Sequence, residues 1–277
     1  MIPVSNHEQQ KAGVRQLFDT VAGGYDSPVM RYFPSAAERL AALLNPASGD
    51  RILDVACGTG VAAIALAQKI APHGQVQAVD ISDNMLDKAR SNIQQAGLQN
   101  IDLHSMDAMQ LDFPPQYFDA AACAFGLFFL PDVSAGAKAI FRVLKPGGQF
   151  IASTFSDTAF TPLIDLYSEQ MAEFGVPAAQ STRDDLQHET DCRALFTEAG
   201  FIDVKTTRAQ LGYHLADGQD WWEIIRNSAL RGKLEQLDAP QQAAFRLKHL
   251  ATIDKLADAE KIWLDVEVIY TIGTRPN

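Results

Sequence analysis

The sequence has few cysteines, no long apolar run and a shortage of positive charge. Its three cysteines, Cys57, Cys123 and Cys192, are far apart and lack the spacing of a disulfide framework or a zinc site, so we expect reduced thiols and no bound metal. The first residues contain no apolar stretch of signal-peptide length, and no segment approaches the roughly 18 continuous apolar residues of a membrane span. We therefore expect a cytoplasmic protein that does not enter a membrane.

Positive charge is both scarce and scattered. The chain has 23 Lys and Arg against 34 Asp and Glu, a formal net charge of −11, and no basic run. This balance disfavours nucleic acid and anionic membranes as partners. The 277 residues, 47% of them hydrophobic, suit one large domain or one domain with an insertion. The expected partner is a small molecule, and the sequence does not indicate an oligomeric state.

Short apolar runs alternate with helical patterns between residues 51 and 155. This alternation is typical of βαβ units, and the dense apolar strands predict a parallel sheet covered by helices. The expected strands are 51–56, 75–80, 101–106, 118–124 and 149–155, and the expected helices are 60–70, 82–96 (capped by Ser82) and 133–143.

The segments on either side of this core are predicted to be largely helical. Residues 1–48 form an N-terminal helical cap, in which Ser5 and Glu8 make a capping-box pattern and the first helix ends at Gly23-Gly24. Residues 49–156 form the nucleotide-binding core. Residues 157–277 carry helices near 161–174 and 190–199, then two late strands, the second at 262–273. These strands bracket a helical insertion at about 215–260.

The stretch "ILDVACGTG" joins the first core strand to a helix. Gly58 and Gly60 allow a tight turn that presents backbone N–H groups and a helix N-terminus to a nucleotide. Ala63 occupies the third glycine position of the dinucleotide fingerprint, which tolerates alanine, so this pattern alone leaves NAD as an alternative. A purely structural turn is the other alternative.

One aspartate accompanies each of the first four strands. Asp80 can accept two ribose hydroxyls, each bond worth about 1.5–3 kcal/mol, and Asp107 can accept the adenine amino group. Asp54 discriminates between cofactors, because a carboxylate at this turn repels a pyrophosphate and attracts an ammonium group. Each aspartate can also serve as a cap or turn residue, and Asp119, at the start of its strand, fits that structural role best.

Five motifs in order carry a family resemblance: "FDTVAGGYD", "LDVACGTG", "AVDISDNML", "MDAMQLDFPPQYFDAAACAFGLFFLPD" and "FRVLKPGGQF". Over residues 14–155 the chain resembles the class I S-adenosylmethionine-dependent methyltransferases, within them the group similar to the C-methyltransferases of ubiquinone and menaquinone biosynthesis. The resemblance implies a Rossmann-like α/β fold with seven strands, the last antiparallel. It also implies S-adenosylmethionine as the cofactor.

The resemblance implies a set of cofactor-binding residues. The methionine end of the cofactor would lie near Asp54, Ala56 and the turn of Gly58, Thr59 and Gly60, and the ribose would lie on Asp80. Adenine would lie beside Ile81, Met85, Asp107 and Ala108. The methionyl group would lie near Phe125, with Tyr25 of the N-terminal helix closing over it. The quinone methyltransferases commonly have an Arg-Asn pair where this chain has Phe128-Phe129, and they lack so long an insertion. We therefore expect a substrate other than a quinone.

The predicted function is methyl transfer from S-adenosylmethionine to a carbon, oxygen or nitrogen atom of a small organic molecule, with aromatic and natural-product-like compounds among the candidates. Catalysis would come chiefly from holding the nucleophile, methyl and sulfur in line and excluding water. Tyr25 or His214 would orient or deprotonate the acceptor. A noncatalytic S-adenosylmethionine-binding protein and an NAD-dependent oxidoreductase remain alternatives.

The insertion at 215–260 is expected to cover the substrate, since it lies between late strands at the carboxyl ends of the sheet. Its first helix carries an apolar stripe, and Pro240 can open a second helix with the stripe Ala244, Leu247 and Ala251. The predicted substrate contacts are Phe129, Trp221, Trp222 and Ile225; ordinary packing of the lid is the alternative for the two tryptophans.

Overall fold

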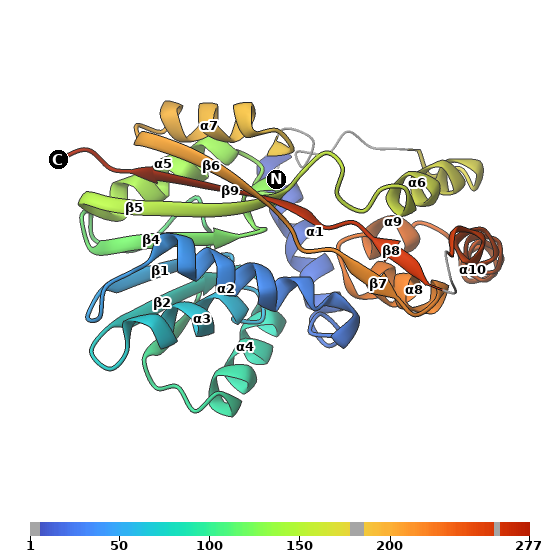
Figure 1. The fold of residues 1–277 in the computed structure, drawn as a ribbon, viewed down its shortest axis with the longest axis horizontal. Helices are drawn as coiled ribbons and strands as arrows, with labels where there is room; N and C mark the ends of the chain where they lie inside the picture. Colours follow the sequence, from blue (N-terminus) through green and yellow to red (C-terminus); the bar gives the residue numbers. More distant parts are fainter. Residues whose placement is uncertain (1–5, 178–185, 258–260) are drawn as a thin grey trace, which may run out of the picture.

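A seven-stranded sheet forms the centre of the computed structural model, which describes residues 6–177, 186–257 and 261–277 (Figure 1). The strand order is β3-β2-β1-β4-β5-β9-β6; β1 to β5 are parallel, and β9 runs antiparallel to both β5 and β6. The predicted Rossmann-like sheet with an antiparallel last strand is confirmed. The strands are β1 (Arg51–Val55), β2 (Gln75–Asp80), β3 (Ile101–Ser105), β4 (Phe118–Ala124), β5 (Leu144–Phe155), β6 (Ile202–Gln210) and β9 (Glu267–Thr274).

The two central strands, β1 and β4, are buried on both faces, which explains their nearly continuous apolar sequences. Their register places Leu53 opposite Ala121 and Asp54 opposite Ala122. The strand order reverses between β1 and β4, so the chain leaves these neighbouring strands in opposite directions. Ligands of open α/β sheets bind at the carboxyl ends of the strands beside such a reversal.

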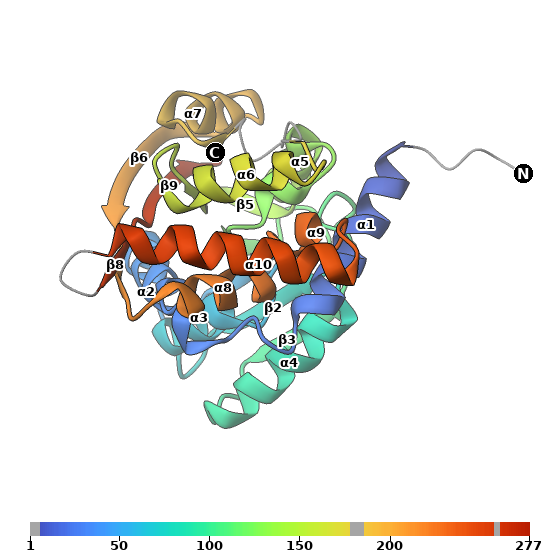
Figure 2. The same cartoon turned by 90° about the vertical axis from the view of Figure 1, so that its right-hand side faces the viewer.

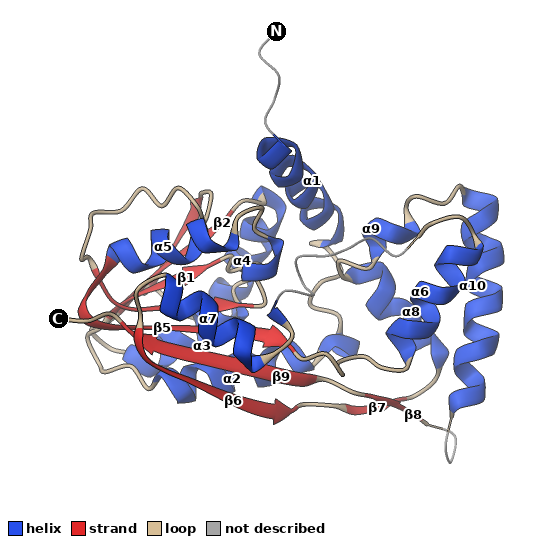
Figure 3. Ribbon diagram, turned by 90° about the horizontal axis from the view of Figure 1, so that it is seen from above, coloured by secondary structure: helices blue, strands red, loops and turns tan. Residues whose placement is uncertain are grey.

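Helices cover both faces of the sheet (Figure 3). On one face α2 contacts α3 and α3 contacts α4, and on the other α5 contacts α7. The hydroxyl oxygen of Ser82 accepts a hydrogen bond from the backbone N–H of Met85, as expected for the cap of α4. The bounds of these helices are α2 (Tyr32–Leu44), α3 (Val61–Ile70), α4 (Asp83–Gln95), α5 (Val133–Val143) and α7 (Glu189–Glu198).

Helix α1 (Asn6–Val21) lies beside α4 and also reaches α9 of the C-terminal half. It ends at Val21, before the predicted stop at Gly23-Gly24, because the backbone turns through hydrogen bonds from Ala22 to Phe18 and from Gly24 to Val21. Tyr25 therefore lies in the turn after the helix and not within it, which corrects the expectation. Ser5 of the predicted capping box lies outside the described residues.

Four helices form a separate layer beyond one end of the sheet (Figures 1 and 2). From here on, the helical cap means this layer and not the N-terminal segment of residues 1–48. Its helices are α6 (Leu163–Glu173), α8 (Gly218–Asn227), α9 (Arg231–Leu234) and α10 (Ala239–Ile253). A two-stranded sheet, β7 (Tyr213–Leu215) and β8 (Ile262–Leu264), connects β6 and β9 to this layer. The capping box of Asp238 and Gln241 starts α10, with proline in its first turn, as predicted for Pro240.

Two predictions about this half were wrong. The single strand expected at 262–273 is divided into β8 and β9, because Asp265 and Val266 leave the strand ladder to hydrogen-bond the side chain of Gln210. The stripe predicted on α10 faces solvent: Leu247 is 77% exposed, and the buried face consists of Phe245, His249 and Ile253.

Candidate functional site

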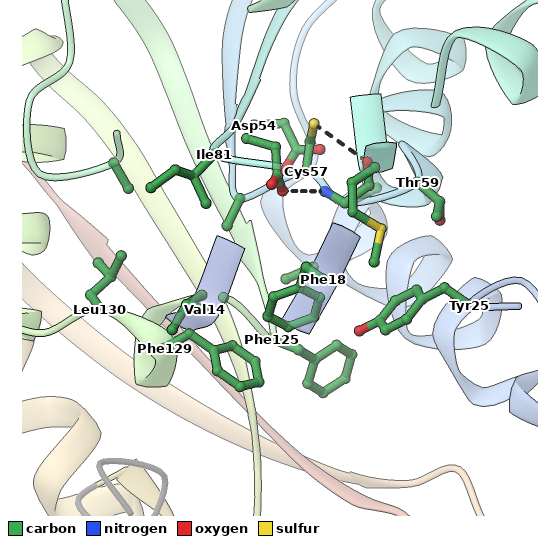
Figure 4. A pocket seen from close by; sticks show the side chains of 18 of the residues that line it. Val14, Phe18, Tyr25, Asp54, Cys57, Thr59, Ile81, Phe125, Phe129 and Leu130 are labelled. Atoms are coloured by element: carbon green, nitrogen blue, oxygen red, sulfur yellow. Dashed lines mark hydrogen bonds between the residues drawn. The ribbon is translucent and has the colours of Figure 1, made fainter. Parts of the chain in front are cut away.

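A deep pocket opens at the carboxyl ends of β1, β2 and β4, under α1 (Figure 4). We call it the first pocket. All predicted cofactor residues except Gly60 line it: Tyr25, Asp54, Ala56, Gly58, Thr59, Asp80, Ile81, Met85, Asp107, Ala108 and Phe125. Figure 4 shows Asp54 and Cys57 at one end and the rings of Phe18, Phe125 and Phe129 at the other.

The backbone around the first pocket adopts conformations that favour glycine. Gly60, with φ of 84°, begins α3 so close to α4 that a Cβ would lie 3.2 Å from the Cβ of Ala89. It shapes the turn without lining the pocket. Ala56 and Phe125 have φ values of 54° and 55° although neither is glycine. Such conformations are uncommon for non-glycine residues and cluster at binding sites, and here they end the two strands that flank the reversal.

Asp54 has the only carboxyl group in the described part of the chain of which both oxygens are buried without a hydrogen-bond partner. Its side chain is fully buried, and neither carboxyl oxygen makes a hydrogen bond there. Burial, reinforced by the charge of Asp80, raises the pKa of Asp54 to about 8, and the nearby backbone N–H of Ala63 opposes this rise only in part. A buried acid without a partner is costly, so its place in the pocket wall indicates that a cationic ligand completes it.

Asp80 holds the glycine turn against the start of α4. One carboxyl oxygen accepts the N–H of Gly58 at 2.8 Å and the other accepts the N–H of Ser82 at 2.9 Å. Burial raises the pKa of this carboxyl group, while these hydrogen bonds oppose the rise. A carboxylate oxygen has more than one lone pair, so Asp80 retains acceptor capacity toward the pocket.

Asp107, the predicted adenine contact, forms an ion pair with Lys11 of α1 at 2.9 Å. Hydrogen bonds to Glu8 and Asp107 raise the pKa of Lys11, which keeps its charge. Lys11, Val14 and Phe18 place α1 directly over the first pocket and leave about 110 Å³ of free space. No local pattern marks Lys11 in the sequence, because its partner Asp107 lies 96 residues away.

A larger pocket, of about 430 Å³, lies between the sheet and the helical cap and has the volume of a small-molecule site. We call it the second pocket. Ile224, Ser228, Ala229 and Leu230 line it from the helical cap, as do Ile164 and Ser168 of α6. The two pockets share four lining residues, all aromatic: Tyr25, Phe33, Phe125 and Phe129. We call these four the aromatic wall.

Tyr25 is the one polar side chain in the aromatic wall. Its ring stacks on that of Phe33 at 5.0 Å, and Figure 4 shows its phenol oxygen directed into the pocket. Burial, with the charges of Asp80 and Asp26, raises the pKa of the phenol well above its ordinary value. Tyr25 is therefore a hydrogen-bond donor at neutral pH and not a base.

Several predicted residues lie outside both pockets. Exposed His214 packs against Trp263 at 5.1 Å, since the pairing of β7 with β8 carries it away from the sheet edge. Trp221 is buried inside the helical cap, where its indole N–H donates to His249. Trp222 and Ile225 are also buried in the cap without lining a pocket. Of the four expected substrate contacts only Phe129 lines either of these two pockets, and His214, an expected catalytic residue, lines neither.

Asp119 has the structural role that its position suggested. It accepts hydrogen bonds from the backbone N–H of Arg51 and from Lys145, at the end of the sheet opposite the pockets. In the described residues no group of three or more His, Cys, Asp and Glu side chains could hold a metal ion. No helix in this part of the chain is long and apolar enough to cross a membrane.

Known proteins resemble this chain in sequence and in fold. Residues 4–214 match the model of the ubiE/COQ5 methyltransferase family. Demethylmenaquinone methyltransferase of Geobacillus kaustophilus is 32% identical over 72% of this chain and 92% of its own length, and aklanonic acid methyltransferase DauC of Streptomyces sp. strain C5 is 34% identical over 56% and 74%. The YcgJ protein of Bacillus subtilis shares the fold with a TM-score of 0.58 at 18% identity, over 88% of this chain and 99% of its own.

These relatives decide between the alternatives that the glycine turn left open. The cofactor is S-adenosylmethionine and not NAD, and the protein is an enzyme that transfers a methyl group to a small organic molecule. The orphaned carboxyl group of Asp54 fits a cofactor that carries an ammonium group. With three quarters of its length matched in order, the chain belongs to the ubiE/COQ5 methyltransferase family.

Proposed function

We propose that the first pocket binds S-adenosylmethionine in one orientation. Asp54 receives the ammonium group, because it is a buried carboxyl group with no partner of its own. Asp80 receives the ribose hydroxyls with its remaining acceptor capacity. Adenine lies toward the residues at the ends of β2 and β3, which are Ile81, Met85, Asp107 and Ala108.

The second pocket holds the methyl acceptor, and the aromatic wall is the observation that supports this assignment. When bound, the cofactor supplies an electrophilic methyl group on a positively charged sulfur. The four rings form the only lining common to the two pockets among the described residues, so transfer between them takes place there. Aromatic faces attract a cation and exclude water, which protects a reactive methyl group from hydrolysis.

The aromatic wall also limits the chemistry of the reaction. It contains no carboxylate, imidazole or amine, and the phenol of Tyr25 keeps its proton. Tyr25 can donate a hydrogen bond that orients the acceptor atom, but it does not deprotonate it. We infer that the acceptor enters as a nucleophile already and that the enzyme accelerates the reaction by alignment.

The acceptor we propose is an aromatic molecule other than a quinone. Phe128 and Phe129, which replace the Arg-Asn pair common in the quinone methyltransferases, both line the second pocket. The departure from the family pattern thus falls where the acceptor binds. The two named relatives are a demethylmenaquinone methyltransferase and an aklanonic acid methyltransferase, which supports a range of acceptors within the family.

We further propose a division of labour along the chain. Residues 1–48 close the first pocket, residues 49–156 bind the cofactor, and residues 157–277 complete the sheet and supply the substrate lid, with α8 and α9 at its centre. The net charge of −11 supports a dissolved small molecule over nucleic acid as partner. The three free, buried thiols support a cytoplasmic location, because thiols stay reduced there.

The proposal is tested by supplying S-adenosylmethionine with a labelled methyl group and a panel of matched acceptors. The panel contains aromatic carboxylic acids, phenols, amines and a demethylated naphthoquinol. We expect label on an aromatic acid or phenol and little on the naphthoquinol. Transfer to the naphthoquinol in preference to all others would contradict the proposed acceptor, and transfer to none of them would contradict the proposed acceptor class.

Asp80→Asn and Asp119→Asn provide a matched pair for the cofactor assignment. The first change should weaken S-adenosylmethionine binding by about 10- to 100-fold in calorimetric titration, since a charge-assisted bond contributes about 1.5–3 kcal/mol. The second should lower stability and leave the affinity within about twofold, because Asp119 lies at the opposite end of the sheet. Equal losses of affinity would show that folding and not contact explains them.

A further inference from the structure

The second pocket contains one positively charged side chain among its described lining residues, Lys233 of α9. It lies on the helical cap, where Gly232 packs against Leu17 of α1. Leu17 also lines this pocket. Lys233 therefore lies where α9 of the helical cap contacts α1.

Among the described residues, the ammonium group of Lys233 has no partner. It makes no ion pair or hydrogen bond within the described part of the chain, although its side chain is half-buried. The nearby acid, Glu235, is taken by Arg231, which pairs with it at 2.6 Å.

Two carboxylates also line the second pocket, but both are exposed. Asp157 lies 3.9 Å from Arg208, whose charge partly offsets its own. Asp165 lies in the first turn of α6, where a negative charge is favoured. The half-buried charge is thus positive, and the negative charges lie at the solvent rim.

We propose that Lys233 binds an anionic substituent of the acceptor and thereby selects acidic aromatic molecules. This inference rests on the proposed function of the second pocket. The aromatic wall holds the flat apolar part of the molecule at the methyl group, and Lys233 binds a carboxylate or phenolate from the side of the helical cap. Lys233 is a specificity-determining residue, and it takes no part in bond making.

Matched fluorescent probes test this assignment on the full chain. The probes are anthracene-2-carboxylate, its neutral carboxamide and the cationic 2-(aminomethyl)anthracene, titrated with and without saturating S-adenosylhomocysteine. We expect the carboxylate to bind about tenfold more tightly than the carboxamide. Lys233→Met should remove that preference, and Lys233→Arg should retain it. The control is Arg231→Met, which changes the neighbouring cation that does not line the pocket.

Four outcomes would overturn the assignment: equal binding of carboxylate and carboxamide by the wild type, an undiminished preference in Lys233→Met, an equal loss in Arg231→Met, or no binding of any probe. Tighter binding of the ammonium probe, abolished by Asp165→Asn, would instead show a site for cations. S-adenosylhomocysteine binding is measured in parallel by calorimetry. Its absence would refute the proposed cofactor site, whereas its presence without a role for Lys233 would refute this inference alone.

Discussion

The ammonium group of Lys11 lies 2.9 Å from a carboxylate oxygen of Asp107, and the pair joins α1 to the segment that follows β3. Only 11% of the Lys11 side chain and 19% of that of Asp107 are exposed. The first pocket beneath them has about 110 Å³ of free space, and Lys11, Val14 and Phe18 of α1 are among the residues that line it. We infer that α1 moves outward when the cofactor enters, and that this ion pair resists the movement.

Lys11→Met should therefore accelerate the association of S-adenosylhomocysteine about three- to tenfold, since a partly buried ion pair of this kind is worth on the order of 1 kcal/mol. Stopped-flow binding measures the rate. Arg90→Met, which breaks an exposed pair with Asp87 on α4, is the control and should leave the rate unchanged. An unchanged rate in Lys11→Met would show that α1 does not limit entry.

Asp54 makes cofactor binding depend on pH. With a pKa of about 8, its carboxyl group carries a proton at neutral pH in the free enzyme, and it must lose that proton to pair with an ammonium group. Affinity should rise from pH 6 toward pH 8, by up to about tenfold per pH unit. Above that range it should fall, because an α-amino group has its own pKa near 8.

Calorimetry in two buffers of different ionisation enthalpy counts the protons released on binding at pH 7. The expected value approaches one for the wild type and approaches zero for Asp54→Asn, whose affinity should also be lower. Proton release that is the same in both proteins would assign the titrating group elsewhere, and no release from the wild type would contradict the raised pKa of Asp54.

Ile224 and Ile225 are adjacent, equally buried and differently placed. Only Ile224 lines the second pocket, whereas Ile225 packs within the helical cap. Ile224→Ala should raise the KM of the acceptor severalfold and leave cofactor affinity within about twofold. Ile225→Ala should destabilise the protein by about 2–5 kcal/mol without changing the KM of the folded enzyme. The opposite pattern would place the acceptor elsewhere.

His249 joins three helices of the helical cap through a buried hydrogen-bond chain. Its Nε2 atom accepts the indole N–H of Trp221 at 2.9 Å, and its Nδ1 atom lies 2.8 Å from Oε1 of Gln170. The ring stacks on that of Phe245. This arrangement uses the neutral imidazole, and burial lowers the pKa of His249 to about 4.

The unfolded chain binds a proton at this histidine near pH 6.5, so acid favours unfolding between that value and pH 4. We expect His249 to lower the free energy of unfolding by about 3 kcal/mol between pH 7 and pH 4. Urea unfolding of the wild type and His249→Gln at both pH values isolates this effect, since glutamine keeps a polar group without titrating. The same acid loss in both proteins would contradict the prediction.

The core could be predicted from the sequence because its signals are local. Dense apolar runs, the glycine turn and the Ser82 cap each act within a few residues, and they located the ends of β1 to β4 to within about one residue. The start of β5 was missed, because the strand begins at Leu144 and not at the predicted residue 149. The three aspartates that were expected to bind the cofactor, Asp54, Asp80 and Asp107, all line the first pocket, because parallel strands end at one edge of the sheet.

The helical cap was predicted less well because its contacts are remote in sequence. The apolar stripe of α8 does lie inward. The residue spacing could not show, however, that the indole of Trp221 donates a hydrogen bond to His249 and does not contact a ligand. Leu247 and its neighbours on α10 resemble a core stripe, yet no element covers that face in the described residues. No sequence pattern marked Lys11 or Lys233 as a site residue. Lys11 stands out by its ion pair with Asp107 in the folded chain, and Lys233 by the lack of a partner among the described residues.

A crystal structure of the enzyme with S-adenosylhomocysteine tests the central claim most directly. We expect the ammonium group within hydrogen-bonding distance of Asp54 and the ribose hydroxyls on Asp80. We also expect the sulfur to face the aromatic wall, with its open side toward the second pocket. A cofactor product bound away from Asp54, or a sulfur directed away from Tyr25 and Phe125, would contradict it.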